Sequence, residues 1–214
     1  MKMLKINEIY YSVQGESTKA GLPCVFIRLT FCNLRCTYCD TEYAFTQGND
    51  LSIDQIVAKV KEFNCRLVEI TGGEPLFQAE TILLMKILAD SGFEVLLETG
   101  GSLPIKDIDP RVKIIMDLKT PSSGMMKKNF YENIKFLKSS DEVKFVLGNR
   151  EDYMWSKEIL SKYDFEKKCE VLFSVVFGKL KPVELVNWIL EDNLNVRFQL
   201  QMHKFIWKPD ERGV

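Results

Sequence analysis

Three features that the sequence lacks exclude several classes of function. Its charges nearly cancel, with 29 Lys and Arg against 30 Asp and Glu and a formal net charge of −1, so it has no overall field that attracts nucleic acid or an anionic membrane. No apolar run is long enough to cross a bilayer, and the first residues lack the apolar core of a signal peptide. We therefore expect a cytoplasmic protein that acts on a small molecule, with no nucleic-acid partner and no membrane partner.

Features that mark domain boundaries are also missing. The chain shows no internal repeat, no low-complexity tract and no long linker rich in Pro, Gly or Ser. With 214 residues, of which 46% are hydrophobic, it is long enough to bury one substantial core. We expect a single domain over residues 1–214.

Histidine is nearly absent, because His203 is the only one in the chain. A solitary histidine is more often a structural residue than a catalyst, so it is a secondary candidate for the site. Cysteine is the informative residue instead. Six cysteines are present, and Cys32, Cys36 and Cys39 form one short C-x3-C-x2-C run directly after an apolar segment.

Three thiolates are one too few for either common cysteine-held metal centre. An iron–sulfur cube has four irons, each normally held by one thiolate, so three ligands leave one iron open. Structural zinc takes four ligands, usually from two separated pairs. The chain has no second pair, and we expect Cys24, Cys65 and Cys169 to be buried free thiols. The spacing favours an iron–sulfur cluster with an open iron, with zinc or unliganded thiols as the alternatives.

Short apolar segments alternate with helical patterns along most of the chain, as in βα units that build a parallel sheet. The expected strands are Pro23–Phe31, Leu67–Thr71, Phe93–Thr99, Val112–Leu118, Glu142–Leu147, Glu170–Phe177 and Val196–Gln201. The named helices run from a capping box at Ser52 towards Asn64, over Gln78–Ser91 and from Pro182 to about Asp192. The helical signal between Leu118 and Glu142 is weak. The fold class is therefore α/β, as either a full or partial barrel or an open doubly wound sheet.

In each of these folds ligands meet the carboxyl ends of the strands. Residues suited to chemistry follow the expected strands at those ends: the cysteine run, Thr71–Pro75, Glu98–Gly101, Asp117–Lys119 and Gln201–His203. Within the second of these segments, Gly72 and Gly73 leave the backbone bare, and Glu74 adds a carboxylate that suits an ammonium group. An ordinary strand-to-helix turn is the alternative interpretation of this segment. Its combination with the cysteine run favours a ligand-binding loop.

The cysteine run and the glycine pair together resemble the radical S-adenosylmethionine superfamily. The resemblance lies in the cysteine spacing, in the aromatic Tyr38 before the third cysteine, and in Gly72–Pro75 at a suitable distance. In that superfamily the three cysteines hold a [4Fe-4S] cluster, and S-adenosylmethionine chelates the fourth iron through its amino and carboxyl groups. Reduction by one electron yields a 5′-deoxyadenosyl radical that abstracts a substrate hydrogen atom, so the cofactors supply the difficult step.

Further segments narrow the resemblance to the 7-carboxy-7-deazaguanine synthase family. They are Tyr11–Ser17, Arg28, Cys39–Thr41, Asp117–Gly124 and Gln199–Trp207, which span nearly the whole chain. Family members convert 6-carboxy-5,6,7,8-tetrahydropterin to 7-carboxy-7-deazaguanine with loss of ammonia, on the route to queuosine, and they regenerate S-adenosylmethionine. The resemblance implies a partial (β/α)6-type barrel of parallel strands with reduced helices. Val175 stands where many relatives have proline, and the cysteine run has the short superfamily spacing.

The resemblance also implies roles for individual residues. The cluster would be held by Cys32, Cys36 and Cys39, and S-adenosylmethionine would meet Gly73, Glu74, Asp117, Leu118, Lys119 and Ser174. The substrate would meet Val13, Gln14, Gly15, Glu16, Arg28, Thr71, His203 and the carboxylate of Val214. Amides suit pterin ring atoms, and guanidinium suits a carboxylate. The Thr41 hydroxyl would bind Mg2+, an ion that prefers oxygen ligands.

The partners that the resemblance implies are a reducing electron donor such as flavodoxin and a second copy of the chain in a homodimer. Two other functions are alternatives. One is a glycyl-radical-type activating enzyme that acts on a partner protein, and the other is a non-enzymatic iron–sulfur or zinc protein. The segments Gln14–Glu16 and Gln199–Trp207 argue against the activating enzyme.

Overall fold

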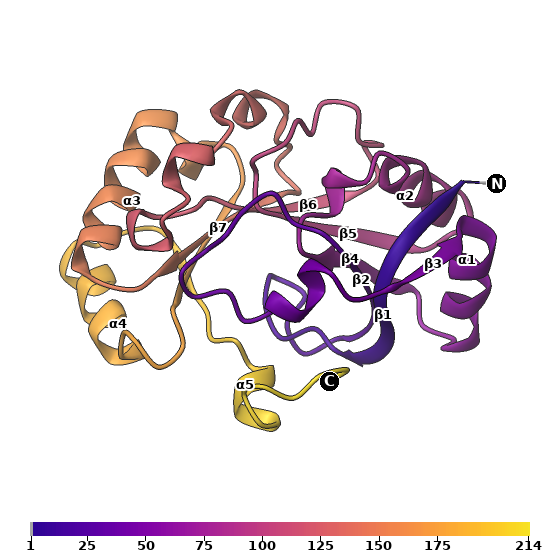
Figure 1. Cartoon of the computed structure of the whole chain (residues 1–214). Helices are drawn as coiled ribbons and strands as arrows, with labels where there is room; N and C mark the ends of the chain where they lie inside the picture. The colour runs from indigo at the N-terminus through magenta and orange to yellow at the C-terminus, as the bar shows by residue number, and fades with distance from the viewer. Residues whose placement is uncertain (1) are drawn as a thin grey trace.

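A single nine-stranded sheet forms the centre of the computed structural model, which describes residues 2–214 (Figure 1). The spatial order is β3-β1-β2-β4-β5-β6-β7-β8-β9. The strands are β1 (Met3–Val13), β2 (Pro23–Leu29), β3 (Asn49–Ser52), β4 (Leu67–Gly72), β5 (Glu94–Thr99), β6 (Lys113–Asp117), β7 (Glu142–Leu147), β8 (Glu170–Val175) and β9 (Arg197–Phe198). Every pair from β2 to β9 is parallel. Within the described residues the two edge strands do not pair, so the barrel is partial and the predicted α/β class is confirmed.

The seven expected strands are all present, although the last is cut to two residues. Two strands, β1 and β3, are not among those expected. β1 runs antiparallel to both β2 and β3 and extends the sheet at its amino-terminal edge. Its buried Leu4 and Ile6 alternate with more exposed residues, which is the pattern of a half-buried strand. β3 has only four residues, of which three are polar, and pairing with β1 rather than propensity makes it a strand.

Two pairs of helices cover the outer face of the sheet (Figure 1). α1 (Ile53–Glu62) and α2 (Thr81–Asp90) lie on one flank, and α3 (Arg150–Tyr163) and α4 (Pro182–Glu191) lie on the other. The expected capping box opens α1, because the Ser52 hydroxyl accepts from the Gln55 amide and the Gln55 side chain accepts in return. α3 and the short α5 (His203–Ile206) are not among the helices named from the sequence.

The helices are reduced where the sequence signal is weak. No α-helix joins β5 to β6, and β6 is joined to β7 by three 3-10 turns, Pro121–Ser123, Met126–Lys128 and Tyr131–Phe136. This outcome confirms the prediction of reduced helices. The missing cover leaves room at the carboxyl ends of the central strands for loops and for the C-terminal segment.

The apolar core lies between the sheet and its helices. One cluster packs strands β1 to β5 against Ile56 of α1 and Leu84 of α2, and another packs β6 to β8 against Tyr153 of α3 and Leu185 of α4. Because side chains alternate along a strand, the opposite face of the same strands points to the interior of the partial barrel. That interior holds the polar residues.

All six cysteines are free thiols. Cys24 is fully buried as expected, but Cys65 and Cys169 are partly exposed, so the expectation that all three are buried is wrong for those two. Both stand at the amino-terminal ends of strands, where the sheet gives way to solvent-facing loops.

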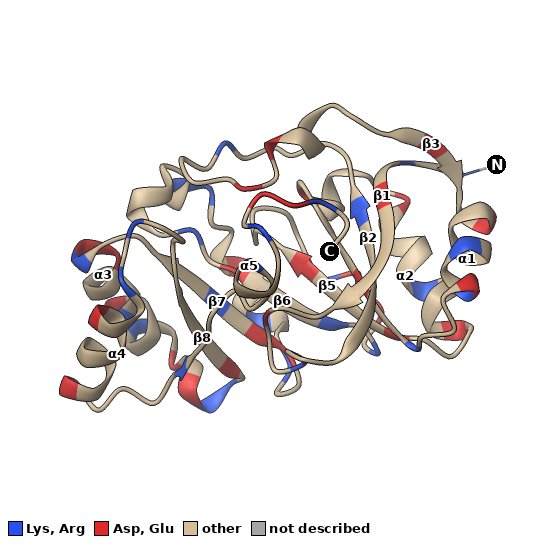
Figure 2. Ribbon diagram, turned by 90° about the horizontal axis from the view of Figure 1, so that it is seen from below, with Lys and Arg blue, Asp and Glu red and all other residues tan. Residues whose placement is uncertain are grey.

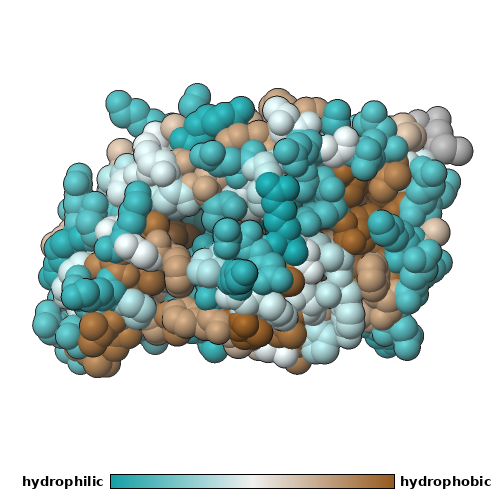
Figure 3. Space-filling model, turned by 60° about the horizontal axis from the view of Figure 1, so that its bottom comes forward, coloured by the Kyte–Doolittle hydropathy of each residue, from teal (hydrophilic) through white to brown (hydrophobic). Residues whose placement is uncertain are grey.

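The C-terminal segment crosses the open side of the partial barrel (Figure 2). α5 and the chain terminus lie over the middle of the sheet in this view, beside charged residues of the central strands. The surface on this side is mostly hydrophilic at its centre, and apolar residues gather in separate groups towards its edges (Figure 3). No helix within residues 2–214 is both long and apolar enough to span a membrane.

Candidate active site

A cavity of about 680 Å3 opens at the carboxyl ends of the central strands. It brings together most of the residues that the sequence singles out, from segments far apart in the chain. The predicted site residues that line it are Val13, Gln14, Gly15, Glu16, Arg28, Cys32, Cys36, Cys39, Thr41, Thr71, Gly73, Asp117, Lys119, His203 and Val214. The cavity is therefore one candidate site rather than several.

Three predicted cofactor residues do not line the cavity: Glu74, Leu118 and Ser174. Glu74 is fully buried, and its carboxylate accepts hydrogen bonds from the Thr99 hydroxyl at 2.8 Å and the Gly100 amide at 2.8 Å. Burial raises the pKa of Glu74, against the effect of these hydrogen bonds. Leu118 packs in the core, and Ser174 is enclosed with no hydrogen-bond partner for its hydroxyl among the described residues. Glu74 thus links the loop after β4 to the loop after β5, from a position outside the cavity lining.

The cysteine loop follows β2 and is held by local contacts. Phe31 adopts a left-handed backbone (φ 78°) that turns the chain away from the strand. The Leu34 amide donates to Cys32 Sγ at 3.3 Å, and the Thr37 amide donates to the Ser123 carbonyl at 3.0 Å. Leu34 is buried beneath the loop. These contacts present the sulfur atoms of the loop to the cavity.

Burial raises the pKa of the Cys36 thiol to about 11, and the nearby Lys119 ammonium opposes this rise. Burial also raises the pKa of Cys32. A metal centre binds the thiolate, so its binding displaces these protons. Within residues 2–214 no three His, Cys, Asp or Glu side chains are grouped around a single ion position. Three thiols spread along one cavity wall, with an amide on one sulfur, fit a multi-iron cluster.

The backbone of Gly73 packs directly against the start of the cysteine loop, and that of Gly72 packs against Leu29 at the end of β2. A Cβ atom on Gly73 would lie 2.0 Å from the Phe31 carbonyl oxygen and 2.8 Å from Cys32 Cβ. The Glu74 amide also donates to that Phe31 carbonyl at 2.8 Å. Gly72 has φ 134°, a conformation that favours glycine. The glycine pair is thus required by the close approach of two loops, as well as by any ligand.

Asp117 and Lys119 at the end of β6 form an ion pair on the cavity wall, with Lys119 Nζ 2.8 Å from Asp117 Oδ2. The other carboxylate oxygen, Asp117 Oδ1, is buried without a hydrogen-bond partner among the described residues. A buried acceptor of this kind is costly unless a ligand or water donates to it. The pair therefore fits a polar cofactor with hydroxyl or amine groups, such as S-adenosylmethionine.

Charged side chains occupy the floor of the cavity inside the sheet. Lys144 of β7 is buried, and its ammonium pairs with Glu16 Oε2 at 2.9 Å and with Glu98 of β5. Glu69 of β4 is also buried, and it accepts a hydrogen bond from the Gln14 side chain. Burial raises the pKa of Glu69. Burial also acts to raise the pKa of Glu98, but the Lys144 ammonium outweighs this effect, so the pKa of Glu98 is lowered.

Glu69 and Lys144 are not among the residues singled out from the sequence, and Glu98 is singled out only within Glu98–Gly101, without a role of its own. Glu69 and Lys144 each stand in the middle of a segment that reads as a buried strand, Leu67–Thr71 and Glu142–Leu147. A charged residue within a fully buried strand is unusual unless it is paired. That signal in the sequence could have identified both.

Arg28 lies on the cavity wall and is held in place by its neighbours. Its Nε donates to Glu8 at 2.7 Å and its Nη2 donates to the Tyr10 hydroxyl at 2.8 Å. Its guanidinium also lies over the rings of Tyr10 and Tyr43. Both contacts fix the plane of the guanidinium, so its remaining N–H groups are available to a carboxylate in the cavity.

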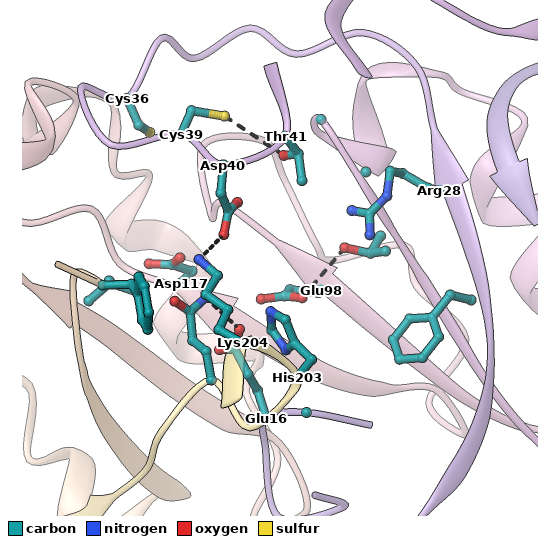
Figure 4. Close-up of a pocket in the computed structure, with 18 of the residues that line it drawn as sticks. Glu16, Arg28, Cys36, Cys39, Asp40, Thr41, Glu98, Asp117, His203 and Lys204 are labelled. Atoms are coloured by element: carbon teal, nitrogen blue, oxygen red, sulfur yellow. Dashed lines mark hydrogen bonds and ion pairs between the residues drawn. The ribbon is translucent and has the colours of Figure 1, made fainter. Parts of the chain in front are cut away.

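The C-terminal segment closes one side of the site (Figure 4). The Met202 amide donates to the Gly15 carbonyl at 2.9 Å, and Lys204 pairs with Asp40 at 2.6 Å, which ties the segment to the cysteine loop. His203 packs so tightly on Gly15 that a Cβ there would lie 2.3 Å from the imidazole Nδ1. Burial lowers the pKa of His203. The histidine is thus a neutral group at the cavity wall.

Thr41 stands beside the last cysteine (Figure 4). Its hydroxyl lies 3.7 Å from Cys39 Sγ, and both side chains line the cavity. A hydroxyl in that position can serve as an oxygen ligand for a hard cation.

Comparison with known proteins shows the family to which the chain belongs. Residues 26–123 match the family model of the radical SAM superfamily. The 7-carboxy-7-deazaguanine synthase of Chlorobaculum tepidum is 47% identical over 99% of this chain and 97% of its own length. The enzyme of that name from Koribacter versatilis is 44% identical over 99% of this chain and 100% of its own length.

Among solved structures, QueE from Escherichia coli has a TM-score of 0.77 and 21% sequence identity, and the match covers 94% of this chain and 95% of that one. Streptococcus suis SuiB bound to S-adenosylmethionine has a TM-score of 0.56 and 14% identity, covering 80% of this chain and 45% of that chain. At these identities both structures show a shared fold.

The packing of the glycine pair yields a testable prediction. Gly73→Ala places a methyl group into the Phe31 carbonyl and Cys32, so the cysteine loop must shift. We expect the free energy of unfolding to fall by about 1–3 kcal/mol and the iron bound per chain after reconstitution to decrease. Gly92→Ala is the control for destabilisation away from the cysteine loop, because a Cβ there meets no atom within 4 Å and its cost is backbone strain at φ 86°. Equal iron content in the two variants would contradict this account of the loop.

The buried ammonium yields a second prediction. Lys144→Met keeps the length of the side chain but leaves Glu16 and Glu98 without their cation. We expect the free energy of unfolding at pH 7, measured with urea, to fall by about 3 kcal/mol. Lys157→Met is the control, since it breaks a surface ion pair with Asp192 and is expected to cost under about 1 kcal/mol.

The same variant has a defined pH dependence. Because the net shift of the Glu98 pKa is downward in the folded protein, its ion pair stabilises the fold above the unfolded pKa and is lost as the pH falls through the folded value. The difference between wild type and Lys144→Met is thus largest near neutrality and shrinks below about pH 4. A difference that grows on acidification would show that Lys144 acts in another way.

Proposed function

The chain belongs to the 7-carboxy-7-deazaguanine synthase family of radical S-adenosylmethionine enzymes, and we propose that it converts 6-carboxy-5,6,7,8-tetrahydropterin to 7-carboxy-7-deazaguanine with loss of ammonia. It is a carbon–nitrogen lyase of the queuosine and 7-deazapurine pathway. The observation that carries the proposal is the 47% identity to a full-length relative of that name. The alternatives, a glycyl-radical-type activating enzyme and a non-enzymatic iron–sulfur or zinc protein, are not favoured by any relative that matches the whole chain.

The chain is an enzyme with a [4Fe-4S] cluster and S-adenosylmethionine, which together supply a radical that abstracts a hydrogen atom from the substrate. We propose that Cys32, Cys36 and Cys39 hold the cluster, because all three thiols face the cavity. Gly73 leaves room beside them, and the Asp117–Lys119 pair offers S-adenosylmethionine a buried acceptor and a cation. Leu118 and Ser174 lie behind this wall and would act only through the backbone or through packing.

The substrate is proposed to lie between the cofactor and the C-terminal segment. Arg28 is oriented to pair with the pterin carboxylate, since Glu8 and the tyrosine rings fix its guanidinium. The segment Val13–Glu16 and Thr71 border the same space, and Gly15 brings the backbone close to His203. Val214 also lines the cavity, and its carboxylate would accept from ring N–H groups. Enclosure by the tail would exclude water from the radical step.

We propose Mg2+ as a further cofactor, held by the Thr41 hydroxyl together with oxygens of the substrate. Support comes from the position of that hydroxyl at the cavity wall, 3.7 Å from Cys39 Sγ. An ion that keeps an incomplete protein shell is typical of Mg2+ sites that include substrate oxygens.

The remaining proposals concern partners. A reducing donor such as flavodoxin would supply the electron, and the enzyme would act in the cytoplasm as one domain over residues 1–214. A homodimer is proposed from family membership. Exposed apolar side chains on α4, including Val183 and Leu190, could take part in such contacts.

One assay tests the function directly. The protein is purified without oxygen, reconstituted with iron and sulfide, reduced, and supplied with 6-carboxytetrahydropterin, S-adenosylmethionine and Mg2+. We expect 7-carboxy-7-deazaguanine by mass spectrometry, and we expect Cys36→Ala to lose both the product and the brown absorbance of the cluster. Cys65→Ala is the control, since that thiol lies outside the cavity. An intact cluster without product would contradict the proposed reaction, and loss of the cluster in Cys65→Ala would contradict the ligand set.

The role of Mg2+ has its own test. Thr41→Val keeps the shape of the side chain but removes the hydroxyl, and we expect the Mg2+ concentration for half-maximal turnover to rise about tenfold. Thr41→Ser should restore the wild-type requirement. Thr46→Val, at an exposed threonine of the same loop, is the control. An unchanged Mg2+ requirement in Thr41→Val would exclude the hydroxyl as a ligand.

A further inference from the structure

The most enclosed titratable group of the cavity floor is Glu69. The whole residue is 2% exposed, whereas the side chain of Glu98 is 27% exposed and that of Glu16 is 15% exposed. Within residues 2–214, Glu69 forms no ion pair, because Lys144 directs its ammonium to Glu16 and Glu98. Its neighbours on other elements that titrate or carry charge are Tyr10, Glu16, Cys24, Glu98 and Lys144.

The surroundings of Glu69 favour a protonated carboxyl group. The Gln14 side-chain nitrogen donates to Glu69 Oε2. The Gln14 side-chain oxygen Oε1 accepts from the Glu16 backbone amide at 3.0 Å, which fixes the orientation of the Gln14 side-chain amide. Glu69 of β4 pairs with Leu96 of β5, so Glu98 is its diagonal neighbour, and both carboxyl groups line the cavity within reach of a mutual hydrogen bond. An ionised carboxylate is an acceptor only, so two carboxyl groups make such a contact only if one of them is protonated.

The local charge balance points the same way. If Glu16, Glu69 and Glu98 were all ionised, three negative charges, that of Glu69 fully enclosed, would face the single ammonium of Lys144. Other cations are already committed, because Arg28 pairs with Glu8 and Lys119 pairs with Asp117. Uncompensated buried charge is strongly unfavourable, and a carboxyl in that position takes up a proton instead.

The proton belongs on Glu69 rather than on Glu98. Glu98 accepts from the Lys144 ammonium and from the Thr71 hydroxyl at 3.4 Å, and both donors stabilise its ionised form. Glu69 receives one neutral donor, the Gln14 amide. The directions of the pKa shifts agree, since burial raises that of Glu69 while Lys144 makes the net shift of Glu98 downward.

We propose that Glu69 is a positioning residue that stays protonated and donates its hydrogen bond to Glu98, so that an anionic Glu98 faces the substrate and accepts from the N–H groups of the pterin ring. The part of this inference that concerns the pterin rests on the proposed function, whereas the part that concerns the proton does not. Glu98 is the partly exposed member of the pair and lines the cavity. Glu69 acts on the substrate only through it.

Infrared spectroscopy tests the proton without turnover. Protein labelled with 13C-glutamate is compared with unlabelled protein near pH 7, where we expect the carbonyl stretch of a protonated carboxyl group that shifts on labelling. The band should be absent from Glu69→Gln. It should persist in Glu142→Gln, the matched control, because Glu142 is equally buried but paired with Lys113. Absence of the band from wild type, or its persistence in Glu69→Gln, would overturn the proposal.

Substrate binding tests the positioning role. The dissociation constant of 6-carboxytetrahydropterin is measured on the reconstituted protein with S-adenosylmethionine across a range of pH. Because the Glu69 pKa is raised, wild-type binding should weaken as the pH rises and the proton is lost. An amide cannot lose that proton, so Glu69→Gln should move this alkaline decline to higher pH. Weaker binding of Glu69→Gln at every pH would show instead that an ionised Glu69 is required.

Glu69→Leu removes the donor and leaves the Gln14 amide unpaired, so binding should weaken about tenfold. If this variant fails to fold, as judged by its thermal unfolding, the comparison of Glu69→Gln with wild type decides the question alone. Wild-type protein that shows the infrared band but makes no 7-carboxy-7-deazaguanine would contradict the proposed function and still support the protonation of Glu69. Product formation without the band would support the proposed function and contradict the protonation of Glu69.

Discussion

The buried ammonium of Lys144 is the charge on which the interior of this partial barrel depends. It stands on a central strand and neutralises carboxylates that come from β5 and from the loop after β1. Charges inside a sheet are tolerated only when they are paired and hydrogen-bonded. The polar floor of the cavity is thus a structural solution as well as a binding surface, and any ligand must fit a charge balance that already exists.

A second constraint is the close packing of loops at the carboxyl ends of the strands. The cysteine loop, the glycine pair and Glu74 contact one another with so little space that a single Cβ would displace them. The C-terminal segment adds a wall through the Lys204–Asp40 pair and through the contact of His203 with Gly15. Reduced helices beside β6 leave the central strand ends free for these loops. The thiols therefore face an enclosed polar space rather than bulk water.

Much of the fold could be predicted from the sequence because local patterns specify it. The apolar strands and the Ser52 capping box are visible in short windows, and each is present. β3 could not be predicted, since its four mostly polar residues become a strand only by pairing with β1. The same holds for the last strand, of which only Arg197 and Phe198 pair with β8. Pairing partners distant in sequence decide such elements, and local propensity does not.

By itself the sequence determined the class of chemistry: the spacing of Cys32, Cys36 and Cys39 favoured an open-iron cluster, and the resemblance to a family implied the reaction. Only the tertiary structure decided which residues share the cavity. It placed Glu74 behind the wall, and it brought Glu69, Glu98 and Lys144 together from three separate strands. The physical reason is that protonation and pairing depend on distance and burial, which arise only when strands far apart in the chain form one sheet.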